Sequence, residues 1–200
     1  FIKFINPELE YQSAIIPLKT LRANIDLVSI LKKEIAIKKI IVKTKYLDFH
    51  SIKPAILQLN LAQFDKKNFN KIKKSKIKIN SEFSFDENYE LSNNFILTGV
   101  IKDTEFVYKE NHKISSLSFD FSYNEQQLKI KNLSSKYNDI QINRGNIEFN
   151  EIKDSISFEA NTEFRFKNNK KVIPIINKSI DKNETFSLKT NLSFKKNKSI

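Results

Sequence analysis

The sequence predicts an α+β fold that is mainly β: an antiparallel meander of short strands with one or two short helices. From about Phe83 onward, apolar side chains recur at every second position, which places them on one face of an extended chain. The segments between these runs are rich in Asn and Asp. Asn tolerates the positive φ of tight turns best among residues with a side chain, so such turns can form although the chain has only two glycines.

The first third of the chain is expected to hold two strands, one helical turn and one helix. Ser51 is the expected N-cap of that helix, and Pro54 fits only in a first turn. In chain order, we expect a strand from Leu21 to Leu27, a helical turn from Val28 to Lys33, a strand over Ile35 to Ile37 and Ile40 to Val42, a helix from Ser51 to Phe64 and a lysine-rich connection from Lys66 to Lys78.

The rest of the chain is expected to be strands, interrupted by a second helix from Val172 to Ile180. The predicted strands are Ile77 to Phe85, Phe95 to Ile101, Phe106 to Tyr108, Leu117 to Tyr123, Leu128 to Ile130, Ile140 to Ile142, Ile147 to Phe149, Ile156 to Phe166 and Phe186 to Phe194. The predicted turns are Asn93-Asn94, Asn124 to Gln127, Asn138-Asp139, Asn143 to Asn146 and Asn168-Asn169.

Composition excludes several classes of function. The chain has no cysteine, which excludes a disulfide scaffold, a thiolate metal site and a cysteine nucleophile. Its only glycines are Gly99 and Gly145, whereas a P-loop, a dinucleotide-binding turn or a nucleophile elbow needs several at fixed spacing. The chain has no Met, so we expect it to be a segment of a longer protein, and it has no apolar run of about 18 residues, so any membrane anchor lies outside these residues.

The net charge of +12 suggests a polyanionic partner, but its composition argues against nucleic acid. All but three of the 35 basic residues are lysines, whereas specific recognition of bases and phosphates favours arginine. Lys, Asn, Ile and Phe all have A/T-rich codons, which accounts for much of the excess. The densest basic run, Asp65 to Lys76, contains one aromatic residue, and elsewhere Phe and Lys fall on opposite strand faces. Nucleic acid is not an expected partner, and attraction to anionic lipid surfaces is the more plausible use of the charge.

The sequence offers little for catalysis or metal binding. His50 and His112 are far apart, and neither has a second good ligand at metal spacing. Asp48 to Ser51 contains the residue types of a catalytic triad in four consecutive positions, whereas a triad converges from separate elements. Asp86 to Asn88 and Asp103 to Glu105 carry carboxylates for acid/base chemistry or calcium, but we expect solvated loop charges there. We expect no enzyme activity, no metal and no cofactor.

Two parts of the chain resemble the AsmA-like family of bacterial envelope proteins. From Leu18 to Lys43, a strand is followed by a Ser29-Ile30-Leu31 turn and then by the pattern I-x-I-x-x-I-x-V over Ile35 to Val42, which resembles the amino-terminal unit of the family. The stretches Gly99 to Phe106, Leu117 to Phe121, Leu128 to Tyr137 and Asn143 to Phe149 resemble the central repeats of its YhdP/TamB-type members. This chain departs from the family pattern in being poor in glycine and rich in lysine, and in lacking the membrane anchor that precedes the unit.

The resemblance implies an amino-terminal unit over residues 1–75 that continues into a curved, groove-like sheet over residues 76–200. Such proteins are anchored in the inner membrane, extend into the periplasm, and help to move phospholipid to the outer membrane and maintain the envelope. The implied partners are phospholipid acyl chains, neighbouring repeats of the same chain, and the inner membrane through an anchor outside this segment. The expected groove lining is Phe83, Phe85, Leu117, Phe119, Phe121, Ile156, Phe158, Phe164 and Phe166.

The periodicity alone leaves other uses of the apolar face open. A sheet must hide such a face by folding over, under a covering layer or with a ligand, and an ordinary core is the simplest of these. A structural or assembly factor of the cell envelope, acting through protein–protein contacts, would have its sheet closed over such a core. A polyanion-binding module is a further alternative. A lipid groove instead requires that the apolar face stay open.

Overall fold

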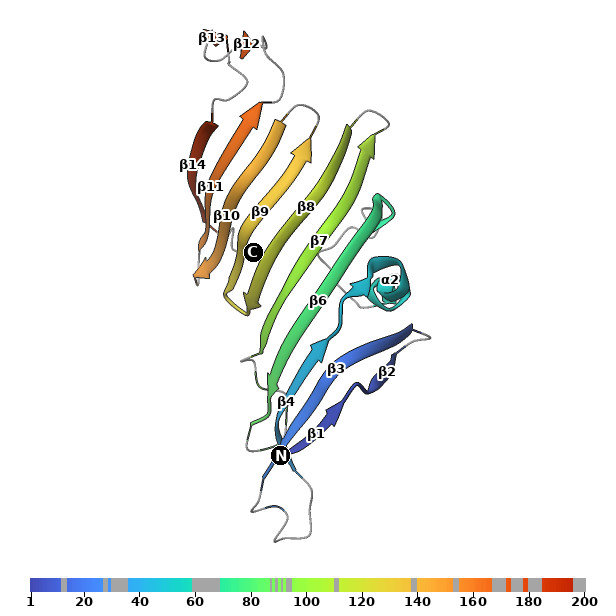
Figure 1. Ribbon diagram of the computed structural model, residues 1–200. Helices are drawn as coiled ribbons and strands as arrows, with labels where there is room; N and C mark the ends of the chain where they lie inside the picture. Colours follow the sequence, from blue (N-terminus) through green and yellow to red (C-terminus); the bar gives the residue numbers. More distant parts are fainter. Residues whose placement is uncertain are drawn as a thin grey trace.

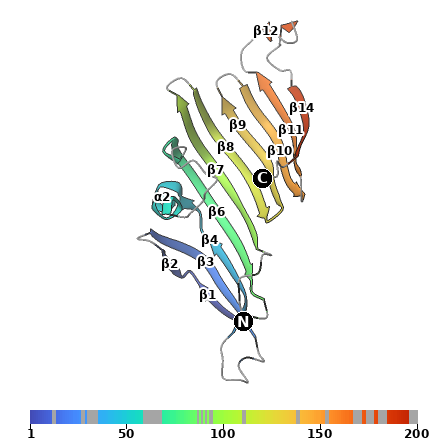
Figure 2. The same ribbon diagram turned by 180° about the vertical axis from the view of Figure 1, so that it is seen from behind.

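The computed structural model describes residues 1–11, 14–26, 29, 36–58, 69–86, 88, 90, 92, 95–109, 112–137, 140–152, 155–166, 172–173, 178–179 and 185–195. Figures 1 and 2 show a single layer of long strands with one helix at one end. In chain order the elements are β1 (Ile2–Ile5), β2 (Glu8–Tyr11), β3 (Ala14–Ile25), β4 (Ile37–Thr44), β5 (Leu47–Asp48), α2 (Phe49–Gln58), β6 (Ile72–Ser84), β7 (Ile96–Lys109), β8 (His112–Asn124), β9 (Gln127–Tyr137), β10 (Ile140–Ile152), β11 (Ser155–Phe166), β12 (Val172–Ile173), β13 (Lys178–Ser179) and β14 (Thr185–Lys195).

The predicted antiparallel meander is confirmed, and it forms one open, curved sheet (Figure 1). Its strands lie in the order β1-β3-β4-β6-β7-β8-β9-β10-β11-β14, so between β6 and β11 each strand pairs with the next along the chain. Two long strands each pair, along one edge, with two shorter strands in succession. β1 and β2 pair with different parts of β3, and β4 and β5 pair with different parts of β6. The expected boundary between residues 75 and 76 falls inside β6.

Three predicted irregular or helical segments are strands instead. The lysine-rich connection becomes β6 from Ile72 onward. Lysines alternate with isoleucines from Lys76 to Ile79, so these lysines can face water while the isoleucines face the other way, and register shifts on either side of Lys74 absorb the break in alternation before it. The predicted turn at Asn143 to Asn146 lies inside β10, where a register shift between Ile142 and Arg144 absorbs the extra residue as a bulge. The predicted second helix is also wrong in its described part, because Val172–Ile173 pairs with Lys178–Ser179 as two short strands.

The predicted helix exists, but it begins earlier. α2 starts at Phe49, and its N-cap is Asp48, whose Oδ1 accepts a hydrogen bond from the backbone N–H of His50 (2.9 Å). Ser51 therefore lies inside the helix, where its Oγ donates to the carbonyl oxygen of Asp48 (2.7 Å). Pro54 falls beyond the first turn, where its ring removes one helical hydrogen bond.

Other local predictions lie wholly or partly outside the described residues. These are the helical turn over Val28 to Lys33 apart from Ser29, the helix beyond Gln58, and the turns Asn93-Asn94, Asn138-Asp139 and Asn168-Asn169.

A small core forms where α2 packs against the sheet. The helix contacts β3, β5 and β6, and the buried apolar side chains Leu18, Leu47, Phe49 and Ile52 gather around it. Phe49 stacks on Phe69 with 6.0 Å between the ring centroids. Of the described apolar residues, the only other buried one is Ala36. The rest of the sheet is therefore held mainly by its hydrogen-bond ladders and by contacts between neighbouring side chains on each face.

Gly99 allows one aromatic ring to lie flat on the sheet. A methyl group at this position would collide with the carbonyl oxygen of Lys78 and would lie 2.6 Å from Cζ of Phe121. We therefore expect Gly99→Ala to lower the free energy of unfolding by about 1–3 kcal/mol, as overpacking does in other proteins. Urea denaturation followed by circular dichroism measures this change.

Gly145→Ala is the matched control. Its added methyl would lie 3.1–3.2 Å from side-chain atoms of Thr162 and Leu133, which can shift, whereas Gly99 faces backbone and a ring. Alanine also costs less backbone entropy than glycine in a strand, by roughly 0.5–1 kcal/mol. Equal destabilisation by the two substitutions would contradict the packing described for Gly99.

Candidate functional site

One side of the sheet gathers most of the apolar side chains, and the strand register defines it. Direct partners in an antiparallel pair point to the same side, and side chains alternate along each strand. We call this side the apolar face and the other the polar face. One row of partners on the apolar face runs across six strands from β6 to β11: Ile79, Gly99, Phe121, Ile130, Ile147 and Ala160.

The predicted lining residues share the apolar face. By register and alternation, this face holds the positions of Phe83, Phe85, Leu117, Phe119, Phe121, Ile156, Phe158, Phe164 and Phe166. The side chain of Phe166 lies outside the described residues. Some rings pack together along this face: the centroids of Phe119 and Phe121 are 6.5 Å apart, and those of Phe149 and Phe158 are 4.9 Å apart. The predicted residues thus come from β6 and the position just after it, from β8 and from β11, and Phe149 of β10 belongs to the same apolar surface.

The apolar face is open over most of its extent. The chain exposes 14641 Å², whereas a compact monomer of 23.5 kDa would expose about 9,800 Å². Large apolar side chains on this face remain exposed from one edge to the other, including Phe4 (51%), Phe149 (37%) and Leu188 (55%). In the described part of the chain, α2 is the only helix that packs on the sheet. Contiguous apolar surface of this extent is typical of an interaction site.

A line of irregularities crosses the middle of the sheet. Register shifts interrupt the pairing of β6 with β7, β7 with β8, β8 with β9 and β10 with β11. Three non-glycine residues along this line have positive φ: Asp103 (53°), Ser116 (52°) and Asn132 (54°). Each extra residue reverses the alternation. The side chains on the apolar face therefore belong to odd-numbered residues in one half of a strand and to even-numbered residues in the other half.

Small polar side chains occupy the apolar face along this line. Ser75 and Thr104 are both buried there, and their hydroxyl oxygens are 2.6 Å apart in a hydrogen bond. Ser135 is also buried on this face, as the partner of Ile142. These groups form a narrow polar row between two apolar areas. The hydrogen bond between Ser75 and Thr104 limits the free-energy cost of burying their hydroxyl groups.

Several members of the apolar face were not predicted as lining residues. They are Ile101, Phe106, Ile114, Ile130, Tyr137, Ile147, Phe149, Leu188 and Leu192. Most of them lie in runs that were recognised as strands. The missing signal was the relative register of those strands, because a bulge between Ile142 and Ile147 keeps both on one face although they are an odd number of residues apart.

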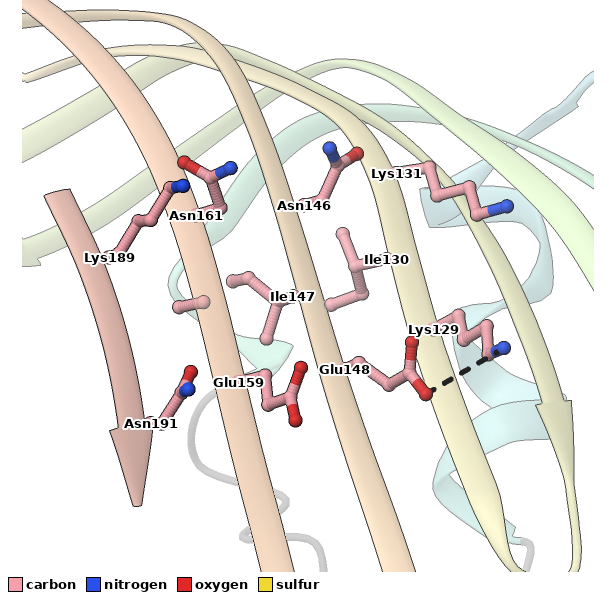
Figure 3. A pocket seen from close by; sticks show the side chains of 11 residues that line it. Lys129, Ile130, Lys131, Asn146, Ile147, Glu148, Glu159, Asn161, Lys189 and Asn191 are labelled. Carbon is pink, nitrogen blue, oxygen red and sulfur yellow. Dashed lines mark ion pairs between the residues drawn. The ribbon is translucent and has the colours of Figure 1, made fainter. Parts of the chain in front are cut away.

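The polar face holds a shallow groove over β9, β10, β11 and β14 (Figure 3). Its walls are two rows of polar side chains, and its floor is the backbone of Ile130, Ile147 and Ala160, whose side chains belong to the apolar face. The rows consist of Lys129, Glu148, Glu159 and Asn191, and of Lys131, Asn146, Asn161 and Lys189. Lys129 pairs with Glu148 (3.7 Å), which also accepts a hydrogen bond from Gln127 (2.8 Å).

Two of the polar residues that the sequence singled out, Asp86 and His50, have structural partners. Asp86 Oδ1 accepts hydrogen bonds from the backbone N–H groups of Asn88 and Glu90 (both 2.9 Å) and so orders a turn. His50 Nε2 donates to the carbonyl oxygen of Lys73 (2.8 Å). Asp103 and Glu105 lie within β7, not in a loop as expected. Among the described residues, no three His, Asp or Glu side chains are grouped so that they could hold a metal ion.

The segment from Asp48 to Ser51, which contains the residue types of a catalytic triad, does not form a reactive centre. Asp48 caps α2, and Ser51 bonds back to the carbonyl oxygen of Asp48. His50 lies on the exposed side of the helix, where it contacts the start of β6. The arrangement therefore serves to begin the helix.

No family model, curated protein or solved structure matches this chain. In the described residues, none of the helical segments has the length and apolar character needed to cross a bilayer.

Proposed function

We propose that this chain is a non-enzymatic, lipid-binding segment of an AsmA-like protein of the bacterial cell envelope. Phospholipid acyl chains would lie along the apolar face while the headgroups stay in water. Through such binding the protein would help to move phospholipid between the inner and outer membranes and maintain the envelope. One observation carries the proposal: in the described part of the chain, the apolar face continues, uncovered, over the strands from β7 to β14.

The dimensions and energetics of the face suit acyl chains. A strand of 13 residues is about 43 Å long, whereas one leaflet of a bilayer core is only about 15 Å thick. Each CH₂ group removed from water contributes about 0.8 kcal/mol, and the acyl chain and the side chains beneath it would be shielded together. The face therefore has room for more than one lipid, but this segment is too short to bridge two membranes.

The edges of the sheet support the proposed continuation into neighbouring repeats. β14 is 11 residues long, and no described strand pairs with its outer edge. The edge formed by β1 and β2 is likewise unpaired among the described residues. Long uncovered edges promote aggregation unless another strand pairs with them. We accordingly propose neighbouring repeats at these edges, and an anchor outside the segment that holds it on the periplasmic side of the inner membrane.

The same edges also favour the second candidate, an assembly factor of the cell envelope. An extended segment of another protein could add to β14 or to β1 and β2 as a further strand, with affinity from main-chain hydrogen bonds. This function would not need a lipid on the apolar face, so lipid content separates the two candidates.

Native mass spectrometry on the chain, purified without harsh detergent from a host that contains membranes, tests the proposed function. We expect co-purified phospholipid, identified by extraction. A folded, lipid-free monomer that also fails to take up added phospholipid would contradict the proposal and favour a protein partner.

A further inference from the structure

β14 forms one edge of the sheet (Figures 1 and 2), and its sequence reads almost the same in both directions. The segment from Phe186 to Phe194 is FSLKTNLSF, with Thr190 at its centre. Of the four pairs of positions that are equidistant from Thr190, three hold identical residues, and the fourth holds Lys189 and Asn191. When two copies of one strand pair antiparallel about a central residue, equidistant positions face each other across the pair. This sequence is therefore suited to pairing with a second copy of itself.

The middle of β14 is exposed on both faces of the sheet. On the apolar face, Leu188 is 55% exposed and Leu192 is 47% exposed. The residues between and beside them that point to the polar face are also exposed: Ser187, Lys189, Asn191 and Ser193. No described strand pairs with the outer edge of β14, and such an edge presents a row of backbone N–H and C=O groups to a further strand.

Only one register of self-pairing matches the side chains on both faces. With Thr190 at the centre, Leu188 faces Leu192 of the second copy, and Lys189 faces Asn191. A slip that puts Lys189 at the centre opposes two lysines, and one that puts Asn191 at the centre opposes Thr190 to Leu192. A slip of a single residue in the pairing would place the apolar face of one copy beside the polar face of the other.

We propose that β14 pairs antiparallel with β14 of a second copy of this chain, with Thr190 on the twofold axis. Direct partners in such a pair point to the same side, so the apolar faces of the two copies join into one continuous face. The inference rests on the proposed function for the use of this joined face, and it names the unit that continues the sheet at β14. The edge formed by β1 and β2 remains for a neighbouring repeat.

Disulfide cross-linking of Thr190→Cys tests this pairing, because the unaltered chain has no cysteine. Cβ atoms of direct partners in an antiparallel pair lie about 4.5–5.5 Å apart, close to the separation in a disulfide. We expect Thr190→Cys to form a covalent dimer under mild oxidation, detected by non-reducing gel electrophoresis. Absence of this dimer would overturn the pairing.

Ser187→Cys is the matched control on the same strand. In the proposed register, residue 187 lies about 20 Å from its counterpart in the second copy and directly opposite Ser193. Ser187→Cys should therefore form no covalent dimer alone, but should cross-link to Ser193→Cys when the two variants are mixed. Equal self-cross-linking of Ser187→Cys and Thr190→Cys would reduce the effect to random collision and overturn the register.

Analytical ultracentrifugation of charge variants tests the same register without a covalent bond. Asn191→Lys opposes a second lysine to Lys189 at two places in the dimer, and should raise its dissociation constant roughly tenfold. Combining it with Lys189→Asn sets Asn against Lys again and should restore dimerisation. Ser157→Lys adds the same charge one strand in from the edge, on β11, and should leave dimerisation unchanged.

Native mass spectrometry of the unaltered chain distinguishes failure of this pairing from failure of the proposed function. A monomer that carries phospholipid would overturn the pairing and leave the lipid-binding function in place. A dimer that neither carries nor takes up phospholipid would contradict that function and leave the pairing in place. Open-ended oligomers would also overturn the pairing, because they require β14 to meet the β1 and β2 edge of the next copy.

Discussion

Replacing Phe119 with Asp should weaken phospholipid binding by roughly 100-fold or more. Phe119 lies near the middle of the apolar face, between Ile101 on the neighbouring strand and Phe121 two residues along its own. An acyl chain in contact with this position would have to remove a carboxylate from water without giving it a partner, which costs several kcal/mol, whereas about 2.7 kcal/mol already accounts for a 100-fold change. Titration with a phospholipid that carries a fluorophore on one acyl chain measures the loss.

Ser122→Asp is the control for Phe119→Asp. Ser122 lies on the same strand but on the polar face, between Thr98 and Lys129, so an added carboxylate there stays in water. We expect this variant to bind lipid as the unaltered chain does. The pair Phe158→Asp and Ser157→Asp repeats the comparison on β11, in case Phe119→Asp does not fold. Folded variants with unchanged lipid binding would show that the apolar face is not the lipid site.

The antiparallel sheet was predictable because alternation of apolar and polar side chains is a local signal. Each run, such as Leu117 to Tyr123, shows by itself which residues share a side. A meander pairs each strand with the next along the chain, so the apolar sides of successive runs are expected to lie on the same face of the sheet. This is why residues as distant in sequence as Phe83 and Phe164 could be assigned to one face before their strands were placed.

The bulges were not predictable in the same way. Asp103, Ser116 and Asn132 are polar residues between apolar runs, a pattern that also marks a turn, and the predicted turn at Asn143 to Asn146 was of this kind. Whether the chain reverses or continues at such a position depends on the partner strand. The neighbouring strands have matching irregularities, so all of them continue and strands of 11 to 14 residues result.

The sequence also could not decide between an open and a closed apolar face. Alternation is the same for a face that packs on a second layer and for one that binds a ligand. The difference depends on whether another element packs on the face, which alternation does not show. In the part of the chain that the structure describes, α2 covers the face near Leu18 and Leu47, while residues such as Leu188 and Leu192 stay exposed.

Phe49→Ala should lower the free energy of unfolding by about 3–5 kcal/mol, the largest effect on stability that we expect of a single truncation. Phe49 is 2% exposed and lies where α2 covers the sheet, so its removal leaves a cavity beside Ile52 and Phe69. Typical domains have a total stability of 5–15 kcal/mol, so this loss would be a large share of it. Urea denaturation measures it.

Phe149→Ala makes the same chemical change on the open face and separates structural from ligand-binding roles. Phe149 is 37% exposed and contacts Phe158, so its truncation leaves a surface that water can reach and should cost only about 1 kcal/mol. Its effect should appear in lipid affinity instead, because an acyl chain loses one of its aromatic contacts. If Phe149→Ala destabilised the chain as much as Phe49→Ala, the apolar face would be acting as a core, and the assembly factor with a closed sheet would become the better account of this protein.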